Sequence, residues 1–274
     1  MKLDVTALGG IVFGVICLIS GFVLEGGKAG ALLEGTAAII VVGGTIGATA
    51  VSFSLDELKK VPRLIRMGLT RSTFEPIELI DKLARYTDIA RKHQPLALEP
   101  EIDRTDDPFL SKGLQLIVDN TDPELIRQML EADIYARLSQ QKMGASIFEA
   151  AGGYAPTFGI MGTVMGLVHV LGQLNGNAAA LASSIGLAFI ATLYGVSTAN
   201  LLWLPMASNL KNKAKHDLLM RQMAMEGILS IQVGMPPSLL RDKLLSFIRP
   251  SSAPGSGKSE GVAQQMTGER AEVL

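Results

Sequence analysis

The chain has 274 residues, of which 48% are hydrophobic and 19% charged, so it is more apolar than an average soluble domain. Its formal net charge of -1 offers no basic surface for nucleic acid, and its single cysteine, Cys17, excludes an intrachain disulfide and a cysteine-rich metal site. Aromatic residues make up only 5% of the chain, whereas glycine occurs 29 times. This balance is typical of membrane helices that pack backbone to backbone.

Two uncharged segments near the beginning of the chain are long enough to cross a membrane. Residues 5–24 and 35–55 contain no Asp, Glu, Lys or Arg. At 1.5 Å per residue, each segment matches the thickness of the hydrocarbon layer. We therefore expect a transmembrane hairpin over residues 1–55, with a short periplasmic loop between its spans and no cleaved signal peptide.

Residues 56–150 carry many charges and predict a soluble helical domain. Apolar residues recur at helical spacing over 74–92, with oppositely charged side chains four residues apart. Two Asp-Pro pairs each place an N-cap residue before a proline at the first helical position. They predict two further helices, near 108–120 and 123–143. This domain is too small to hold an obvious enzyme cleft.

The longest uncharged stretch, residues 151–210, predicts a second transmembrane hairpin. It contains no Asp, Glu, Lys or Arg, and His169 is its only histidine. The stretch is too long for one crossing of about 20 residues and suits two. We expect spans near 154–174 and 181–206, joined by a turn at 175–177.

The remainder of the chain completes the expected topology. Residues 211–249 predict cytoplasmic amphipathic helices, and residues 250–274, rich in Ser, Gly, Pro and Gln, predict a disordered tail. Basic residues follow the second and fourth spans, which places both termini and residues 56–150 in the cytoplasm. The predicted fold class is thus an all-α polytopic membrane protein with four transmembrane helices and a helical cytoplasmic domain.

The uncharged spans restrict the chemistry of the membrane part. An ion relay inside hydrocarbon almost always uses an ionisable side chain, and these spans contain no carboxylate. A conducted ion would need an acid from another subunit, while this chain would contribute the wall of the path. Thr163 and Thr192 are candidates for the wall, because a hydroxyl can replace part of an ion's hydration shell. The alternative is that each hydroxyl bonds back to its own helix.

Two prolines flank the second hairpin. Pro156 and Pro205 either begin and end the spans as ordinary helix boundaries or act as hinges at the cytoplasmic mouth. No P-loop, HExxH, paired cysteine or Ser/His/Asp set occurs in the sequence. We therefore expect no covalent enzyme, no bound metal and no cofactor other than a translocated ion.

Several motifs, taken in order, carry a resemblance to a known family: IIVVGGTIGA (39–48), ARKHQPLALE (90–99), FLSKGLQLIVDNTD (109–122), APTFGIMGTVMGLVHVL (155–171), IATLYG (190–195), LLWLP (201–205) and MEGILSIQVG (225–234). The chain resembles MotA and PomA, the stator A subunits of the bacterial flagellar motor, within the MotA/TolQ/ExbB group, up to about Ile248. TolQ and ExbB energise envelope transport systems and are the alternative. They look less similar, because they typically have three spans and lack the N-terminal hairpin.

The resemblance implies partners and a location. It implies a homopentamer of this subunit around a dimer of a MotB- or PomB-like partner in the lipid of the bacterial inner membrane. The partner's transmembrane Asp would carry the ion, and its periplasmic domain would grip peptidoglycan. Ion flow would rotate or rearrange the pentamer, which would push on the rotor protein FliG.

The resemblance also implies roles for charged residues in ARKHQPLALE. Arg91 and Glu99 match the charged pair that family members use on the rotor, and Lys92 matches a further basic position. Without the resemblance, these charges would be interpreted as a solvated helix surface. Relatives usually have glycine where Gln94 stands, and Pro95 follows it here, so the local backbone can differ.

In the membrane part, the resemblance assigns the two prolines and both threonines. Pro156 and Pro205 match the family's functional prolines, and Thr192 matches the fourth-span threonine beside the partner's Asp. Thr163 stands where sodium-driven relatives look similar and proton-driven relatives often have alanine. Because a hydroxyl suits a partly dehydrated Na⁺, Na⁺ is favoured over H⁺ as the translocated ion, although water held by the same hydroxyl can also carry protons.

Overall fold

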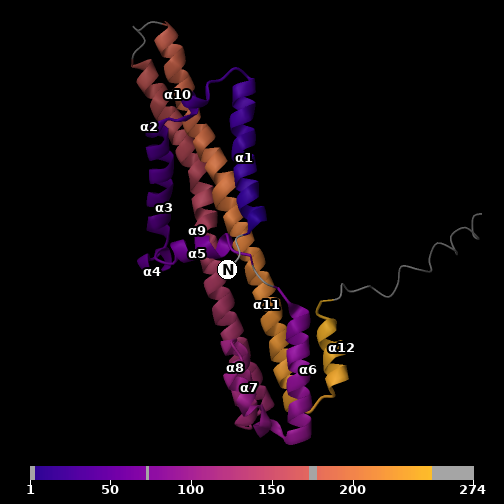
Figure 1. Ribbon diagram of the computed structural model, residues 1–274. Helices are drawn as coiled ribbons and strands as arrows, with labels where there is room; N and C mark the ends of the chain where they lie inside the picture. The colour runs from indigo at the N-terminus through magenta and orange to yellow at the C-terminus, as the bar shows by residue number, and fades with distance from the viewer. Residues whose placement is uncertain (1–3, 72–73, 173–177, 249–274) are drawn as a thin grey trace, which may run out of the picture. The chain divides into compact units, whose positions relative to one another are not determined.

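The computed structural model describes residues 4–71, 74–172 and 178–248, and the regular elements in these ranges are helices (Figure 1). The expected turn at 175–177 and tail at 250–274 lie outside these residues. Contacts divide the chain into two units. The first unit comprises Met1–Phe74 and Gln128–Arg221, and the second comprises Glu75–Arg127 and Gln222–Leu274.

Four helical passages in the described residues are long and apolar enough to cross a membrane. They confirm the expected all-α fold with four membrane helices. The first is α1, and the second comprises η1, α2, the π-helix η2 and α3. The third lies in α9, and the fourth runs through α10 and the π-helix η4 into α11. Their bounds are Val5–Leu24 (α1), Ala29–Leu32 (η1), Gly35–Ala38 (α2), Ile39–Gly43 (η2), Gly44–Ser52 (α3), Pro123–Leu171 (α9), Ala178–Thr198 (α10), Ala199–Trp203 (η4) and Leu204–Gln232 (α11).

Both prolines of the second hairpin lie within continuous helical segments. The helix expected to end near Met143 continues as α9 to Leu171, with Pro156 in its interior. A proline removes one hydrogen bond and crowds the carbonyl four residues earlier, which here belongs to Gly152. Pro205 is the second residue of α11 and comes shortly after the π-helix η4. Proline has no backbone N–H to donate, and the wider turn of a π-helix is a common site of helix bending.

Two short helices follow the second passage within the first unit: α4 (Leu55–Leu58) and α5 (Val61–Gly68). A capping box begins α4, because the Glu57 carboxylate accepts hydrogen bonds of 2.8 Å from both the Ser54 N–H and the Ser54 hydroxyl. These hydrogen bonds lower the pKa of the Glu57 carboxyl. The helix α5 packs closely on α9, since a Cβ atom on Gly144 would lie 2.9 Å from Leu64.

Lys213 of α11 stabilises the end of α5. Its ammonium group donates hydrogen bonds to the carbonyls of Met67, Gly68 and Thr70, at 2.8, 2.7 and 2.6 Å. The Met67 and Gly68 carbonyls belong to the last turn of α5, where a helix leaves its carbonyls without the usual partners four residues later. Burial lowers the pKa of the Lys213 ammonium. The backbone N–H of Asp4 donates to the Leu69 carbonyl at 2.8 Å, which ties the beginning of α1 to the same place.

Asp217 joins α9 and α11 beyond the uncharged part of the hairpin. Its carboxylate accepts hydrogen bonds from Arg137 at 2.8 Å, Gln141 at 2.9 Å and Arg221 at 3.2 Å. Burial alone would raise the pKa of the Asp217 carboxyl, but these donors and the two positive charges outweigh burial and lower it. The carboxylate therefore stays ionised at neutral pH and holds the two helices together.

The second unit is a small helical bundle with its own core. Leu83, Leu98, Leu114 and Ile228 are fully buried in it. Its helices pack closely, because a Cβ atom on Gly113 would lie 2.2 Å from Ile228. The elements that lie wholly within the second unit are α6 (Pro76–His93), η3 (Pro95–Leu98), α7 (Glu99–Asp103), α8 (Pro108–Val118) and α12 (Pro237–Leu245).

Gln94, between α6 and η3, has an unusual backbone conformation. Its φ of 69° and ψ of 161° lie in a region that is essentially restricted to glycine. Pro95 contributes to this, because a residue before proline is excluded from the helical region. Gln94, which stands where relatives usually have glycine, therefore occupies a position whose backbone geometry favours glycine.

We predict that Gln94→Gly stabilises the protein by about 1 kcal/mol, because relief of roughly 1–3 kcal/mol of strain exceeds the entropic cost of glycine. Thermal unfolding of the purified protein, followed by circular dichroism, measures this change. The control is Asn120→Gly. Asn120 also has a positive φ, of 52°, but asparagine tolerates that region, so little change is expected. Equal effects of the two substitutions would contradict the strain at Gln94.

Candidate functional site

The helices α9 and α10 touch backbone to backbone at two glycines. A Cβ atom on Gly195 would lie 2.5 Å from the Ala155 carbonyl oxygen and 3.0 Å from the Gly159 Cα. One on Gly159 would lie 2.9 Å from the Ala191 carbonyl oxygen. Real side chains do not approach a backbone so closely, so any residue larger than glycine forces these helices apart.

This close approach brings the two predicted threonines together. The Thr163 and Thr192 hydroxyls are hydrogen-bonded to each other at 2.5 Å. The Thr163 hydroxyl also contacts the Gly159 carbonyl of its own helix at 3.2 Å and donates across the hairpin to the Ala188 carbonyl at 3.0 Å. The Thr192 hydroxyl reaches the Gly159 carbonyl at 3.4 Å. Both side chains are half-buried, which leaves part of each accessible to another subunit.

Bonding of a threonine to its own helix, the alternative considered from the sequence, describes only part of this arrangement. For Thr163 the contact with Gly159 exists, yet the same hydroxyl also faces Thr192 and the Ala188 carbonyl. Thr198, two turns further along α10, shows the simple case, because its hydroxyl contacts the Tyr194 carbonyl at 2.7 Å and the Gly195 carbonyl at 3.2 Å. The Thr163–Thr192 pair is therefore a polar contact between two helices of a hairpin that has no Asp, Glu, Lys or Arg.

Pro156 lies beside the glycine contact and close to the beginning of α11. A Cβ atom on Gly195 would lie 3.1 Å from the Pro156 Cα. Gly152, one turn before Pro156, packs against Trp203 and Leu204, which immediately precede Pro205. The positions with weakened helical hydrogen bonding on α9 and α11 thus lie near one another, whereas about 20 Å of helix separates Pro205 from Thr192.

The sequence analysis missed Tyr194, which fastens the beginning of the second passage to α10. Its hydroxyl donates a hydrogen bond to the Leu32 carbonyl and accepts one of 3.2 Å from the Glu34 N–H. The sequence does indicate that this hydroxyl has a partner, because a tyrosine in an apolar span usually forms a hydrogen bond. The sequence could not indicate which partner, since the two partners lie about 160 residues away along the chain.

The predicted rotor-facing residues lie in the second unit. Arg91 and Lys92 are exposed at the end of α6, and Glu99 is exposed at the beginning of α7. The Lys92 ammonium is paired with Asp88 at 2.7 Å. Arg91 and Glu99 form no salt bridge within the described residues, so their charges are available to a partner.

Comparison with known proteins identifies the family. Residues 8–95 match the family model described as "Motility protein A N-terminal", and residues 101–223 match the "MotA/TolQ/ExbB proton channel family". Motility protein A of Bacillus subtilis is 38% identical over 247 residues, which cover 90% of this chain and 91% of that protein. The chain belongs to the motility protein A family. This confirms the resemblance found in the sequence.

Two further relatives agree with this membership. The chemotaxis protein PomA of Vibrio alginolyticus is 32% identical over 90% of this chain and 95% of its own length. The structure of the flagellar MotAB stator complex of Bacillus subtilis contains a chain that matches with a TM-score of 0.85 at 37% identity. That match covers 90% of this chain and 96% of the other. The likeness to family members thus extends over most of both units.

We predict that Gly195→Ala destabilises the hairpin by about 1–3 kcal/mol, because the added methyl group meets backbone atoms that cannot move aside. The measurement is the thermal stability of the protein purified in detergent. The matched control is Gly186→Ala on the same helix, where a Cβ atom meets nothing within 4 Å. That control should be neutral or slightly stabilising, since alanine favours the helix. A stable Gly195→Ala protein would contradict the close contact.

Proposed function

We propose that this chain is the A-type stator subunit of a bacterial flagellar motor. With a MotB-like partner it forms a cation channel in the inner membrane, and ion flow through that channel generates torque on the rotor. Membership of the motility protein A family supports this function. The observation that carries the mechanism is the Thr163–Thr192 hydroxyl pair in a hairpin that contains no carboxylate.

The chemistry of the pair supports a wall of the path, with the acid supplied by a partner. Each hydroxyl has lone pairs that can coordinate a cation or hold a water molecule. Neither can carry a full charge across the bilayer, which is the usual task of an ionisable group. A MotB-like transmembrane Asp beside Thr192 would complete the site. Several copies of this chain, as in the expected homopentamer, would surround that acid.

The direction of insertion follows from the basic residues. Lys59, Lys60, Arg63 and Arg66 follow the second span, and Lys211 and Lys213 follow the fourth. The positive-inside rule then places both termini and the second unit in the cytoplasm. There, Arg91, Lys92 and Glu99 would face the rotor protein FliG.

The match to the motility protein A N-terminal model favours the motor over an ExbB- or TolQ-like energiser. The match covers the first transmembrane hairpin and continues to residue 95, so it includes Arg91 and Lys92. An energiser of envelope transport would not need these parts. The proposed function accounts for both of them, with the hairpin in the membrane and the two cations at the rotor.

We predict that Thr192→Ala lowers ion flux and torque about tenfold while the complex still assembles. Loss of a hydroxyl ligand that contributes roughly 1.4 kcal/mol raises the barrier to ion passage by that amount, which lowers the rate about tenfold. Flux into liposomes that contain this chain and its partner measures the effect, and the Asp→Asn partner gives the background. The matched control is Thr198→Ala, whose hydroxyl bonds only to carbonyls of α10 in the described residues. Unchanged flux in Thr192→Ala liposomes would remove the threonine from the path.

We predict that Arg91→Glu slows or stops swimming while ion flux through the complex stays normal, because only the contact with the rotor is reversed in charge. Glu99→Lys should act in the same way. The matched control is Arg85→Glu, an exposed arginine on the same helix α6. Wild-type swimming of both Arg91→Glu and Glu99→Lys cells would exclude these residues from the rotor contact.

We predict that swimming speed rises with external sodium and withstands a protonophore. Thr163→Ala should raise the sodium concentration that gives half-maximal speed about tenfold, because one oxygen ligand is lost. Tracking of swimming cells at constant ionic strength provides the measurement. Speed that ignores sodium and collapses with the protonophore would establish H⁺ as the coupling ion instead.

A further inference from the structure

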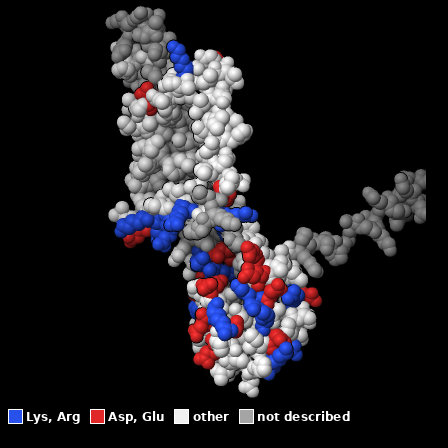
Figure 2. Space-filling view, viewed as in Figure 1, with Lys and Arg blue, Asp and Glu red and all other residues white. Residues whose placement is uncertain are grey.

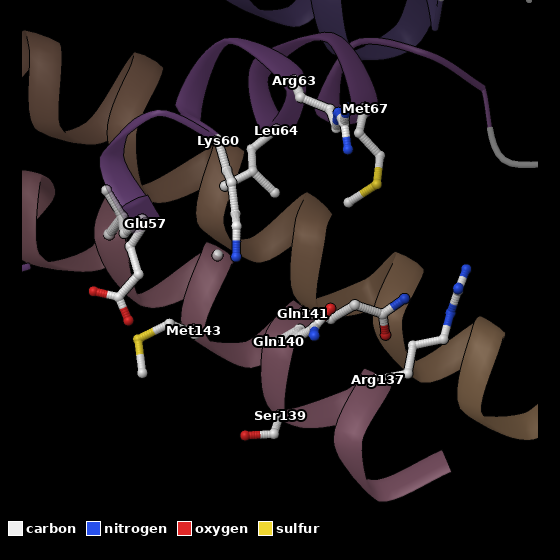
Figure 3. A pocket seen from close by; sticks show the side chains of 12 residues that line it. Glu57, Lys60, Arg63, Leu64, Met67, Arg137, Ser139, Gln140, Gln141 and Met143 are labelled. Atoms are coloured by element: carbon white, nitrogen blue, oxygen red, sulfur yellow. The ribbon is translucent and has the colours of Figure 1, made fainter. Parts of the chain in front are cut away.

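A cavity of about 490 Å³ lies between α5 and α9 within the first unit (Figure 3). Three cationic side chains line it: Lys60, which immediately precedes α5, Arg63 of α5 and Arg137 of α9. In Figure 3, Lys60 extends from the beginning of α5 toward Gln140 and Gln141 of α9. None of the proposed ion-path or rotor residues lines this cavity, so the channel and rotor functions leave it unexplained.

The electrostatics of the cavity favour an anion. Its one carboxylate, Glu57, accepts hydrogen bonds from the Ser54 N–H and hydroxyl in the capping box, and the Lys60 charge also contributes to lowering the pKa of this carboxyl. Lys60 and Arg63 form no salt bridge within the described residues. Arg137 shares the Asp217 carboxylate with Arg221, and its side chain remains 52% exposed. The cavity thus gathers more positive charge than the chain itself neutralises.

The other side of the lining is apolar. Leu64 and Met67 of α5 and Met143 and Ile147 of α9 contribute it. Leu64 packs closely on Gly144 and against the buried cluster that contains Ala145 and Phe148, so this surface is preformed. A small inorganic anion would not contact these apolar side chains. A ligand that combines a phosphate with hydrocarbon would contact both the cationic and the apolar parts of the lining.

The apolar end of the cavity lies at the level of the headgroup layer of a bilayer. Glu149 is the last charged residue before the uncharged run, and Ile147 and Met143 precede it by about 3 and about 9 Å along α9, whereas Gln140 and Arg137 precede it by about 14 and about 18 Å. The headgroup layer is roughly 5–8 Å thick on each side of the hydrocarbon, so the cavity begins in this layer at Ile147 and extends beyond it, away from the uncharged run. The helix α4 begins only three residues after α3 ends at Ser52, which keeps the other wall at the same level. Figure 2 shows basic side chains around α5 where the uncharged surface ends.

We propose that this cavity binds the headgroup of an anionic phospholipid. The phosphate lies between Lys60 and Arg63, and the glycerol and first acyl carbons lie against Leu64 and Met143. Such a lipid would fasten α5 to α9 from outside the hairpin. This site adds to the proposed motor function and does not depend on ion conduction.

The test uses the full-length chain with its partner, purified from membranes and reconstituted into nanodiscs with equal parts of phosphatidylglycerol and phosphatidylcholine. Native mass spectrometry then reports how much phosphatidylglycerol each complex retains over phosphatidylcholine. Removal of one cation beside an anionic headgroup should weaken binding about fivefold. We therefore expect Lys60→Gln and Arg63→Gln each to reduce retention of phosphatidylglycerol about fivefold.

Two further variants separate the cavity from general attraction to an anionic surface. Arg66→Gln removes the same charge one turn along α5 from a residue that does not line the cavity, so retention should stay at the wild-type level. Gln140→Trp fills the cavity without changing any charge, so retention should fall. The same spectra give the mass of the complex, which shows that each variant still assembles.

Three results would overturn the proposal. Equal losses for Arg63→Gln and Arg66→Gln would indicate non-specific surface attraction. Full retention in Gln140→Trp would place the lipid elsewhere. Pyrophosphate that displaces phosphatidylglycerol from the wild-type complex, but not from Lys60→Gln, would assign the cavity to a soluble phosphate. Because the readout is lipid mass, its failure is distinguishable from failure of the motor function, which is measured as flux.

Discussion

The contact between Gly159 and Gly195 is the constraint on which the membrane part depends. Apolar side chains gain nothing by leaving lipid for another helix, so helices in a bilayer associate through close packing and hydrogen bonds. Hydrogen bonds between membrane helices contribute on average only about 0.6 kcal/mol each. The few that cross between α9 and α10 in the described residues are therefore secondary to the backbone contact, which fixes the register of the two helices and brings Thr163 opposite Thr192.

The weakness of these hydrogen bonds is consistent with an ion path. A hydroxyl bound by less than 1 kcal/mol can exchange its partner for water or a cation at little cost. A buried carboxylate in the same place would need a permanent counter-charge and would be costly without one. A hairpin without charged side chains stays stable in lipid by itself, and under the proposed function a partner adds the acid. The nearest charges on its helices, Glu149 and Lys211, are paired with each other at its end.

Much of the fold could be predicted because the absence of charge over 5–24, 35–55 and 151–210 is a direct physical requirement of hydrocarbon. Local signals were also reliable: the aspartates at 107 and 122 accept hydrogen bonds from the first turns of α8 and α9. The continuity of α9 through Pro156 was missed, because the cost of a proline depends on its neighbours, and here the crowded carbonyl belongs to a glycine. The π-helices before Gly44 and Leu204 have no sequence signal of their own.

Contacts between distant segments were the part that sequence could not provide. Gly43 and Gly47 have the same spacing as Gly162 and Gly166, yet a Cβ atom on either of the first pair meets nothing within 4 Å. The second pair packs against Ala188 and Ala191 of α10. Spacing shows which residues share a helix face, whereas the neighbour of that face is decided by the tertiary fold.

The charged end of α6 illustrates how structure separates residues that sequence treats alike. Arg91 and Lys92 are adjacent cations in one motif, but Lys92 is paired with Asp88, whereas Arg91 is not paired within the described residues. An exposed pair contributes about 0–1 kcal/mol, so Lys92 could exchange its partner, although Arg91 would lose nothing by binding one. After the turn at Gln94-Pro95, Leu96 is 65% exposed, whereas Leu98 is buried in the core of the second unit. The burial of Leu98 fixes the beginning of α7, and with it the position of Glu99.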